Sequence, residues 1–235
     1  GDLVSNGDFS QEGSELITNG DFSTDSDWTK GTGWSIGDGS ANCDGGSGNL
    51  IQSITGSTPN KTFLITFTLS NYITGSVTPS FVGAYDSSLI YNANGTYSAY
   101  INSVADNRLV FYSQAFIGSI DNVSVKEVGQ DWSLNDSCFF TPIGINIKNT
   151  PSVGILSASG SSLLTIGNQY KMTYEITQNN NGSIKLASAV SEPMVSTVGT
   201  HTKYFTADQA AIRFIRDGVD VDVTIDNITI KEITE

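Results

Sequence analysis

The second half of the chain repeats the first. SIDNVSVKEV at 119–128 returns as TIDNITIKEI at 224–233, and FLITFTLSN at 63–71 matches YKMTYEITQ at 170–178. GTYSAY at 95–100 also matches GTHTKY at 199–204, so order and spacing hold across both copies. Self-similarity of this kind marks a structural unit that has been copied. The sequence therefore predicts two related domains in 235 residues.

A shorter repeat lies at the N-terminus. LVSNGDFS at 3–10 returns as LITNGDFS at 16–23, whereas the second domain begins at VGQDWS, 128–133, without an opening of its own. Loop tips of a compact domain tolerate insertions, and the ends of a domain often lie close together. We therefore predict that an inner domain, residues 14–127, is inserted into an outer domain formed by residues 1–13 and 128–235. Two alternatives stay open for the first opening, a strand donated to a neighbouring subunit and a remnant of an upstream repeat.

Strand-like alternation predicts an all-β fold. Apolar side chains at Phe63, Ile65, Phe67 and Leu69 alternate with threonines and Leu64, and the segment at 170–177 has the same period of two. Clusters of Gly, Asn, Ser and Asp at 37–49 and 177–183 have the composition of turns. No segment has a convincing helical period. Short strands at regular spacing favour two antiparallel β-sandwiches.

Charge and cysteine content restrict the partners. The formal net charge of −13 argues against nucleic acid and anionic membrane surfaces, which attract clustered Lys and Arg. No apolar run reaches the roughly 18 residues that span a bilayer, so we expect no membrane insertion. Cys43 and Cys138 form neither a disulfide framework nor a metal-binding spacing, and we interpret them as two unlinked core residues, with a mutual disulfide as the alternative.

Several motifs resemble a known family. These motifs are N-G-D-F-S near the domain start, GWSIGDGSA at 33–41 and the closing I-D-N-V-S-V. They resemble galactose-binding-like jelly rolls, which include the carbohydrate-binding modules of glycoside hydrolases. The doubled opening and VKEVGQDW at 125–132 resemble bacteriophage tail-fibre and head-appendage proteins. Such motifs identify a fold and leave the function open.

This resemblance implies a function. It implies two jelly rolls that display glycan-binding surfaces on an extracellular or virion surface, with glycans and other virion or cell-surface proteins as partners and with an oligomer as an open alternative. One rival is a tandem carbohydrate-binding module of a secreted polysaccharide-degrading enzyme. The other is a structural fibre, filament or capsid-decoration subunit that uses strand complementation.

The resemblance also implies a structural calcium ion between the first and last strands, one per domain. By position, its ligands are Asp21, Ser23 and Asp121 in the inner domain and Asp8, Ser10 and Asp226 in the outer domain. Alternation places the last aspartate of each set on the core-facing side, where an ionised carboxylate is costly unless it is paired. Many related modules have an acidic residue where this chain has serine. The alternative is an aspartate that accepts hydrogen bonds from backbone N–H groups at a strand end.

Aromatic side chains in variable segments are the candidates for sugar binding. A pyranose needs a flat aromatic ring for its apolar face and polar groups for its hydroxyls. The candidates are Tyr72, Tyr85, Tyr91, Tyr97 and Trp34. Trp28 and Trp132 occupy equivalent places and Trp34 begins a strand, so packing is an alternative for each tryptophan. The outer-domain stretch 187–201 is poor in aromatics, and we expect weaker sugar binding there, or none.

No motif supports catalysis. His201 is the single histidine, and its counterpart in the other copy is Tyr97. A glycosidase needs two carboxylates about 5–10 Å apart, and nothing in the sequence marks such a pair. Zinc motifs, phosphate-binding glycine loops and nucleophile elbows are absent from the sequence. We therefore expect a non-catalytic protein.

Overall fold

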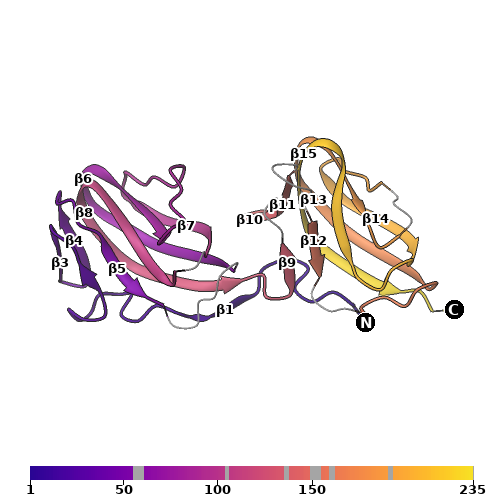
Figure 1. Ribbon diagram of the computed structural model, residues 1–235, viewed down its shortest axis with the longest axis horizontal. Coiled ribbons are helices and arrows are strands. Elements are labelled where there is room, and N and C mark those ends of the chain that lie inside the picture. Colours follow the sequence, from indigo (N-terminus) through magenta and orange to yellow (C-terminus); the bar gives the residue numbers. More distant parts are fainter. Residues whose placement is uncertain are drawn as a thin grey trace. The chain divides into compact units, whose positions relative to one another are not determined.

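The computed structural model describes residues 1–54, 61–103, 106–134, 138–148, 155–158, 162–189 and 193–234. The chain divides into two compact units. The inner unit is residues 12–128, and the outer unit combines residues 1–11 with residues 129–235. All strand pairs among the described residues are antiparallel (Figure 1).

The inner unit is built around two long strands that pair along their length. Its strands are β1 (Glu12–Glu15), β2 (Thr29–Lys30), β3 (Trp34–Gly37), β4 (Ser40–Asp44), β5 (Leu50–Ser53), β6 (Thr62–Phe81), β7 (Gly95–Asn102) and β8 (Arg108–Val128). On one side, β8 pairs with β6, which in turn pairs with β7. On its other side β8 pairs in succession with β5, β4 and β1, and β2 and β3 extend β5 and β4.

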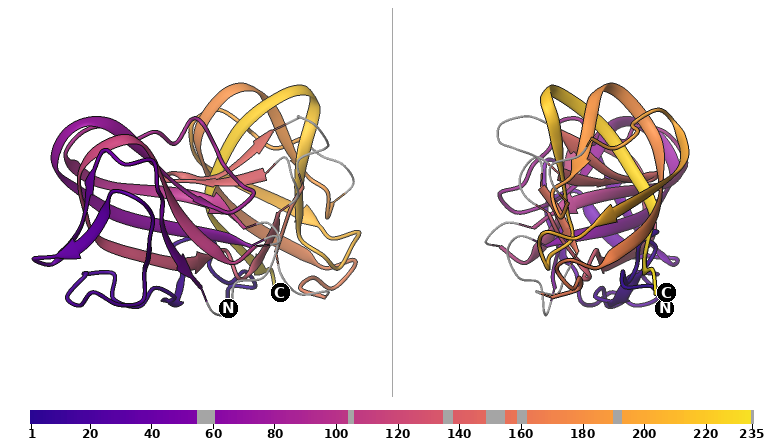
Figure 2. Two further views of the ribbon diagram at one scale, coloured as in Figure 1. Left: turned by 60° about the vertical axis from the view of Figure 1, so that its left-hand side comes forward. Right: turned by 90° about the vertical axis from the view of Figure 1, so that its right-hand side faces the viewer.

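Among the described residues, the outer unit repeats this arrangement with seven strands, because no strand corresponds to β1. Its strands are β9 (Trp132–Leu134), β10 (Cys138–Thr141), β11 (Gly144–Lys148), β12 (Ile155–Ala158), β13 (Gln169–Leu186), β14 (Gly199–Thr206) and β15 (Arg213–Glu232). The order β10-β11-β15-β12-β9 corresponds to β3-β4-β8-β5-β2, and β13 and β14 correspond to β6 and β7. Both views of Figure 2 show the long strands β13 (orange) and β15 (yellow) arching side by side.

Each long strand bends where its pairing is irregular, and so contributes to both layers of its sandwich. In β6 the register with β8 shifts between Ser70 and Ser76, and Gly75 lies there with φ of 75°. A Cβ at Gly75 would lie 2.1 Å from the carbonyl oxygen of Ala115. In β13 the register shifts around Gly182, which has φ of 77°. Glycine at both bends provides the backbone freedom that the turn between layers requires.

The cores follow the predicted alternation. In β6 every second side chain from Phe63 to Leu69 is buried, and in β13 the same holds from Tyr170 to Ile176. Burial of large apolar side chains on one face of each strand is the main favourable contribution to folding of such a sandwich. The predicted fold class, two antiparallel jelly-roll β-sandwiches, is confirmed.

The first opening belongs to the outer unit. Its Leu3 N–H donates to the carbonyl of Ile230 on β15 (2.8 Å), and the N–H of Ile228 donates to the carbonyl of Gly7 (2.8 Å). Phe9 is buried and packs edge-to-face on Trp132, with ring centroids 5.1 Å apart. The segment therefore closes the outer unit along the edge of its last strand.

The second opening makes the same contacts in the inner unit. Leu16 N–H donates to the carbonyl of Val125 (3.0 Å), and the N–H of Val123 donates to Gly20 (2.8 Å). Phe22 lies 5.1 Å from Trp28 between ring centroids. Each opening therefore serves one unit, and one unit is inserted in the other.

Cys43 lies in the inner unit and Cys138 in the outer unit; both are buried, and no disulfide joins them. The interpretation of the two cysteines as unlinked core residues is confirmed.

Candidate functional site

Tyr91 and Tyr97 form part of the wall of the inner unit. Their ring centroids are 4.6 Å apart, and each ring packs on buried Phe67, at 5.1 Å and 5.7 Å. The Tyr97 hydroxyl donates to the carbonyl of Ala93 (2.9 Å). Burial, and then the neighbouring Tyr97, raise the pKa of the Tyr91 hydroxyl. Both rings are half-buried, so their main contacts are with the core.

Tyr72 fixes the bend of β6. Its hydroxyl donates to the carbonyl of Gly75 (3.1 Å), and its backbone N–H donates to the side-chain oxygen of Asn94 (2.9 Å). The half-buried ring lies 6.4 Å from Phe116. These contacts account for Tyr72 as a structural residue of the bend.

Tyr85 is the predicted tyrosine that offers an exposed ring. It follows β6 and has 46% of its surface exposed. Its hydroxyl accepts a hydrogen bond from the side-chain amide of Gln114 (2.8 Å), and its ring lies edge-on to Tyr112, with centroids 5.3 Å apart. Tyr112 and Gln114 are two residues apart on β8 and therefore point to the same face of the sheet, opposite to buried Phe111. We call Tyr85, Tyr112 and Gln114 the tyrosine–amide cluster.

Trp34, the remaining predicted sugar-binding residue, lies in the core instead. It is buried, its indole N–H donates to the carbonyl of Gly48 (2.9 Å), and its ring stacks on Phe116 at 6.2 Å. Trp28 and Trp132 are also buried, and their indole N–H groups donate to the carbonyls of Asn19 and Asn6. A sugar cannot stack on rings that are enclosed in this way.

The predicted metal ligands of the outer unit are brought near each other. The Asp8 carboxylate accepts hydrogen bonds from the Ser10 hydroxyl (2.9 Å) and N–H (3.3 Å). Asp226 accepts from the N–H of Asn227 (2.8 Å). Burial is the largest cause that raises the pKa of Asp226, and the charges of Glu175 and Asp8 raise it further. The outer unit thus concentrates negative charge around Asp226.

In the inner unit the corresponding side chains form mostly local hydrogen bonds. Asp21 accepts from the N–H of Ser23 (3.3 Å), and Asp121 accepts from the N–H of Asn122 (2.6 Å) and from its side-chain amide (3.1 Å). These bonds correspond to the alternative interpretation of a strand-end aspartate. Within the described ranges, no group of three or more His, Cys, Asp or Glu side chains is arranged to hold a metal ion.

Both aspartates are half-buried and do not lie on the fully buried face, contrary to the alternation argument. The cause is the residue that follows each of them. Asn122 and Asn227 have φ of 51°, in the left-handed region, and this interrupts the strict alternation of the strand.

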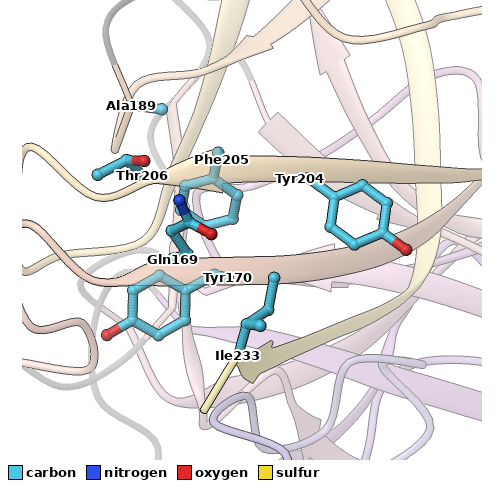
Figure 3. Close-up of a pocket in the computed structure, with 7 residues that line it drawn as sticks. All are labelled: Gln169, Tyr170, Ala189, Tyr204, Phe205, Thr206 and Ile233. Atoms are coloured by element: carbon cyan, nitrogen blue, oxygen red, sulfur yellow. The ribbon is translucent and has the colours of Figure 1, made fainter. Parts of the chain in front are cut away.

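The outer unit has an exposed aromatic residue that the sequence analysis did not select. Tyr204 on β14 is 64% exposed and borders a pocket of about 480 Å³. The pocket is lined by Gln169, Tyr170, Ala189, Tyr204, Phe205, Thr206 and Ile233 (Figure 3). Alternation along β14 could have found Tyr204, since it neighbours buried Phe205 and so points away from the core.

Comparison with known proteins assigns this chain to no family. Neither protein-family profiles nor curated protein sequences gave a match. Among solved structures, the N-terminal CBM22-1–CBM22-2 tandem domain of Paenibacillus barcinonensis Xyn10C matches 95% of this chain and 99% of its own, with a TM-score of 0.36 and 10% identity. A similarity this low carries no assignment of function.

Within the described part of the chain, no helix is long and apolar enough to cross a membrane.

Proposed function

We propose that the protein is a non-catalytic glycan-binding module and that its inner unit binds sugar at the tyrosine–amide cluster. The observation that carries the proposal is the exposed ring of Tyr85, held in place by Tyr112 and by the amide of Gln114. A ring fixed in this way has little conformational entropy to lose when a ligand stacks on it.

The cluster combines the two kinds of group that sugar recognition needs. The face of an exposed aromatic ring provides apolar contact for the C–H face of a pyranose, and an adjacent amide provides donors and an acceptor for hydroxyl groups. The side-chain amide of Gln114 has a second N–H and an oxygen available for a ligand in addition to its bond to Tyr85. Tyr91, Tyr97 and Tyr72 support the surrounding surface without presenting a free ring.

The experiment is a glycan array followed by titration calorimetry on any ligand found. Tyr85→Ala removes the ring, and we expect it to weaken binding about tenfold or more, in the range of aromatic hot spots. Tyr85→Phe, the matched control, keeps the ring and removes only the bond to Gln114, so it should retain most of the affinity. Equal loss in both variants, or no change in either, would contradict the stacking proposal.

We extend the proposal to the larger protein or particle that carries this module. A bacteriophage tail-fibre or head-appendage component on a virion surface is the setting that the doubled opening resembles. A tandem carbohydrate-binding module of a secreted polysaccharide-degrading enzyme is the second candidate, and a structural subunit is the third. Virion genes beside the coding sequence support the first, and a catalytic domain in the same gene supports the second. A well-folded protein that binds no glycan supports the third.

We propose that structural calcium, if bound, lies in the outer unit between the first opening and β15. Carboxylate and hydroxyl oxygens from Asp8, Ser10 and Asp226 are hard donors that suit calcium. Burial is the main cause that raises the pKa of Asp226, and a divalent cation there would offset the smaller contribution from the charges of Glu175 and Asp8. The inner-unit set of Asp21, Ser23 and Asp121 has the same number of carboxylates but no neighbour like Glu175, because Thr68 stands at that position in the repeat.

The calcium proposal predicts a melting temperature that falls when a chelator is added and recovers with excess calcium, because a ligand that binds only the native state stabilises it. Asp226→Asn should abolish this response, while Asp121→Asn should leave most of it. An unchanged melting temperature, together with no bound metal by elemental analysis, would rule out the proposal.

A further inference from the structure

The outer unit carries a row of one tyrosine and two lysines across three adjacent strands. Lys171 on β13 is paired with Tyr204 on β14 and with Lys231 on β15. Directly paired residues point to the same face, with Cβ atoms about 4.5–5.5 Å apart. All three side chains are exposed, whereas their chain neighbours Tyr170, Phe205 and Ile230 are buried. The row therefore lies on the outer face of the sheet.

A second row on the same face borders the adjoining pocket, which buried Tyr170, Phe205 and Ala189 also line. Gln169 is paired with Thr206, and its carbonyl accepts from the N–H of Ile233 (2.8 Å). In Figure 3 Tyr204 comes from β14 and Ile233 from the chain just beyond β15, with β13 and Gln169 between them. An exposed ring, an aliphatic side chain, an amide and a hydroxyl thus border one pocket, which is the set of groups that a pyranose requires.

Neither lysine forms an ion pair within the described part of the outer unit. Lys171 and Lys231 make no ion pair and no side-chain hydrogen bond with any residue that the structure describes. Like charges directly opposite each other on neighbouring strands destabilise a sheet. These two unpaired ammonium groups lie beside a sugar-sized pocket. An anionic ligand bound there would relieve the repulsion between them.

The negative side chains of this face lie at its other end. Thr173 and Thr229 form the next row and share a hydrogen bond (2.6 Å), and Glu175 and Asp226 are paired in the row after that. At about 3.3 Å per residue, the acidic row is roughly 13 Å from the lysine row, beyond the Debye length of about 8 Å at physiological salt. Asp2 lies nearer and keeps its negative charge; its carboxylate accepts hydrogen bonds from the backbone N–H groups of Val4 and Ile230 and forms no ion pair with either lysine.

The inner unit has the same position without the free charges. Tyr100, the counterpart of Tyr204, is paired with Leu64, which in turn is paired with Lys126. Lys126 donates to the carboxylate of Glu12 (2.8 Å), and this bond raises the pKa of Lys126. Leucine therefore replaces one lysine of the row, and a glutamate neutralises the other. The chain provides its own matched control for the lysine row.

We propose that the outer unit binds an anionic saccharide, with the sugar ring against Tyr204 and Ile233 and its acidic group on Lys171 and Lys231. Two lysines and one pocket fit a single acidic sugar residue. A chain with a net charge of −13 repels an extended polyanion such as nucleic acid, so the attraction is local. This site goes beyond the tyrosine–amide cluster of the inner unit and does not rest on it.

The test is calorimetric titration of the full chain with a panel of acidic oligosaccharides and their neutral counterparts. Oligogalacturonate and its methyl ester share one backbone and differ in charge, a sulfated oligosaccharide tests the second source of negative charge, and polyacrylate is a polyanion without a sugar ring. We expect binding to the acidic members, weakening as salt is raised. Lys171→Gln and Lys231→Gln should each weaken it about tenfold, as expected for loss of a hydrogen bond to a charged group.

Tyr204→Ala should weaken acidic-sugar binding roughly tenfold, while Tyr100→Ala and Lys126→Gln, the inner-unit controls, should leave it unchanged. Tyr85→Ala separates the two proposals, because it should affect only sugars bound by the tyrosine–amide cluster. No binding to any acidic oligosaccharide, or binding unaffected by the Tyr204 and lysine variants, would overturn the inference. Equal affinity for polyacrylate, or for the methyl ester, would overturn it as well.

Discussion

Gly7 and Gly20 occupy the positions in the two openings that admit no side chain. A Cβ would lie 1.9 Å from the carbonyl oxygen of Ile228 at Gly7, and 2.0 Å from that of Val123 at Gly20. The residues around each glycine adopt matching conformations, since Asn6 and Asn19 have φ of 49° and 53°. Asparagine tolerates this left-handed region, and glycine permits the close approach of two backbones. The N-G-D-F motif is therefore explained by packing of the opening on the last strand.

Gly20 allows this close approach to be tested. Gly20→Ala should destabilise the inner unit by about 2 kcal/mol or more, because the added methyl group must displace the backbone that holds the bond from Val123. Gly37→Ala is the control, since a Cβ at Gly37 meets nothing within 4 Å and should change stability by at most about 0.5 kcal/mol. Chemical denaturation of both variants measures the difference. Similar effects of the two substitutions would contradict the close-approach argument.

The raised pKa of Asp226 predicts that the stability of the outer unit depends on pH. Burial raises the pKa of its carboxyl in the folded state, and the charges of Glu175 and Asp8 raise it further. The hydrogen bond from the Asn227 N–H acts in the opposite direction. The folded state then holds the proton to a higher pH than the unfolded state, so this group favours folding most at low pH, below its unfolded pKa of 3.8. That contribution is lost as the pH rises through the folded pKa.

Asp226→Asn, measured without calcium, should therefore raise the melting temperature at neutral pH and have less effect near pH 3.5. The amide oxygen of the variant can still accept the bond from the N–H of Asn227, so that contact is retained. Melting curves of both proteins across this range provide the test. A variant that is less stable than the parent protein at neutral pH would contradict the assigned cause.

The first opening acts as the missing edge strand of the outer unit. It adds hydrogen bonds to β15, and Phe9 packs on Trp132 and Phe140 with centroids 5.1 Å and 6.3 Å away. In the inner unit, β1 and the second opening do the same for β8. Two consecutive segments of similar sequence thus complete two different sandwiches.

Deletion of residues 1–11 should destabilise the outer unit and leave the inner unit unchanged. Loss of Phe9 alone removes a buried aromatic residue, a change that costs about 3–5 kcal/mol in protein cores. Hydrogen exchange measured separately on β15 and β8 distinguishes the two units. Faster exchange in both, or in neither, would contradict the assignment. Loss of multimers with both units intact would favour strand donation to a neighbouring subunit.

Alternation and turn composition were sufficient to predict the two sandwiches and their buried faces, because the period of two is strict from Phe63 to Leu69 in β6 and from Tyr170 to Ile176 in β13. The assignment of the first opening to the outer unit could be inferred because residues 3–10 and 16–23 have nearly the same sequence. The surfaces that we propose for binding were harder to predict. Tyr85 and Gln114 are 29 residues apart in the sequence, and no local sequence pattern predicts their contact. Trp34 was selected for its residue type, yet its burial against Phe116 depends on long-range packing.

The insertion determines how the chain would carry a mechanical load. Glu12 and Val128, where the chain enters and leaves the inner unit, are paired residues of β1 and β8, and Leu3 is bonded to Ile230. Tension applied to the chain before Leu3 and after Ile230 passes directly through the outer unit and bypasses residues 12–128. The outer unit would rupture first, by peeling its opening segment from β15, and the inner unit would stay slack until then. The inner unit would bear the load only after this first rupture, and its unfolding would then lengthen the chain further.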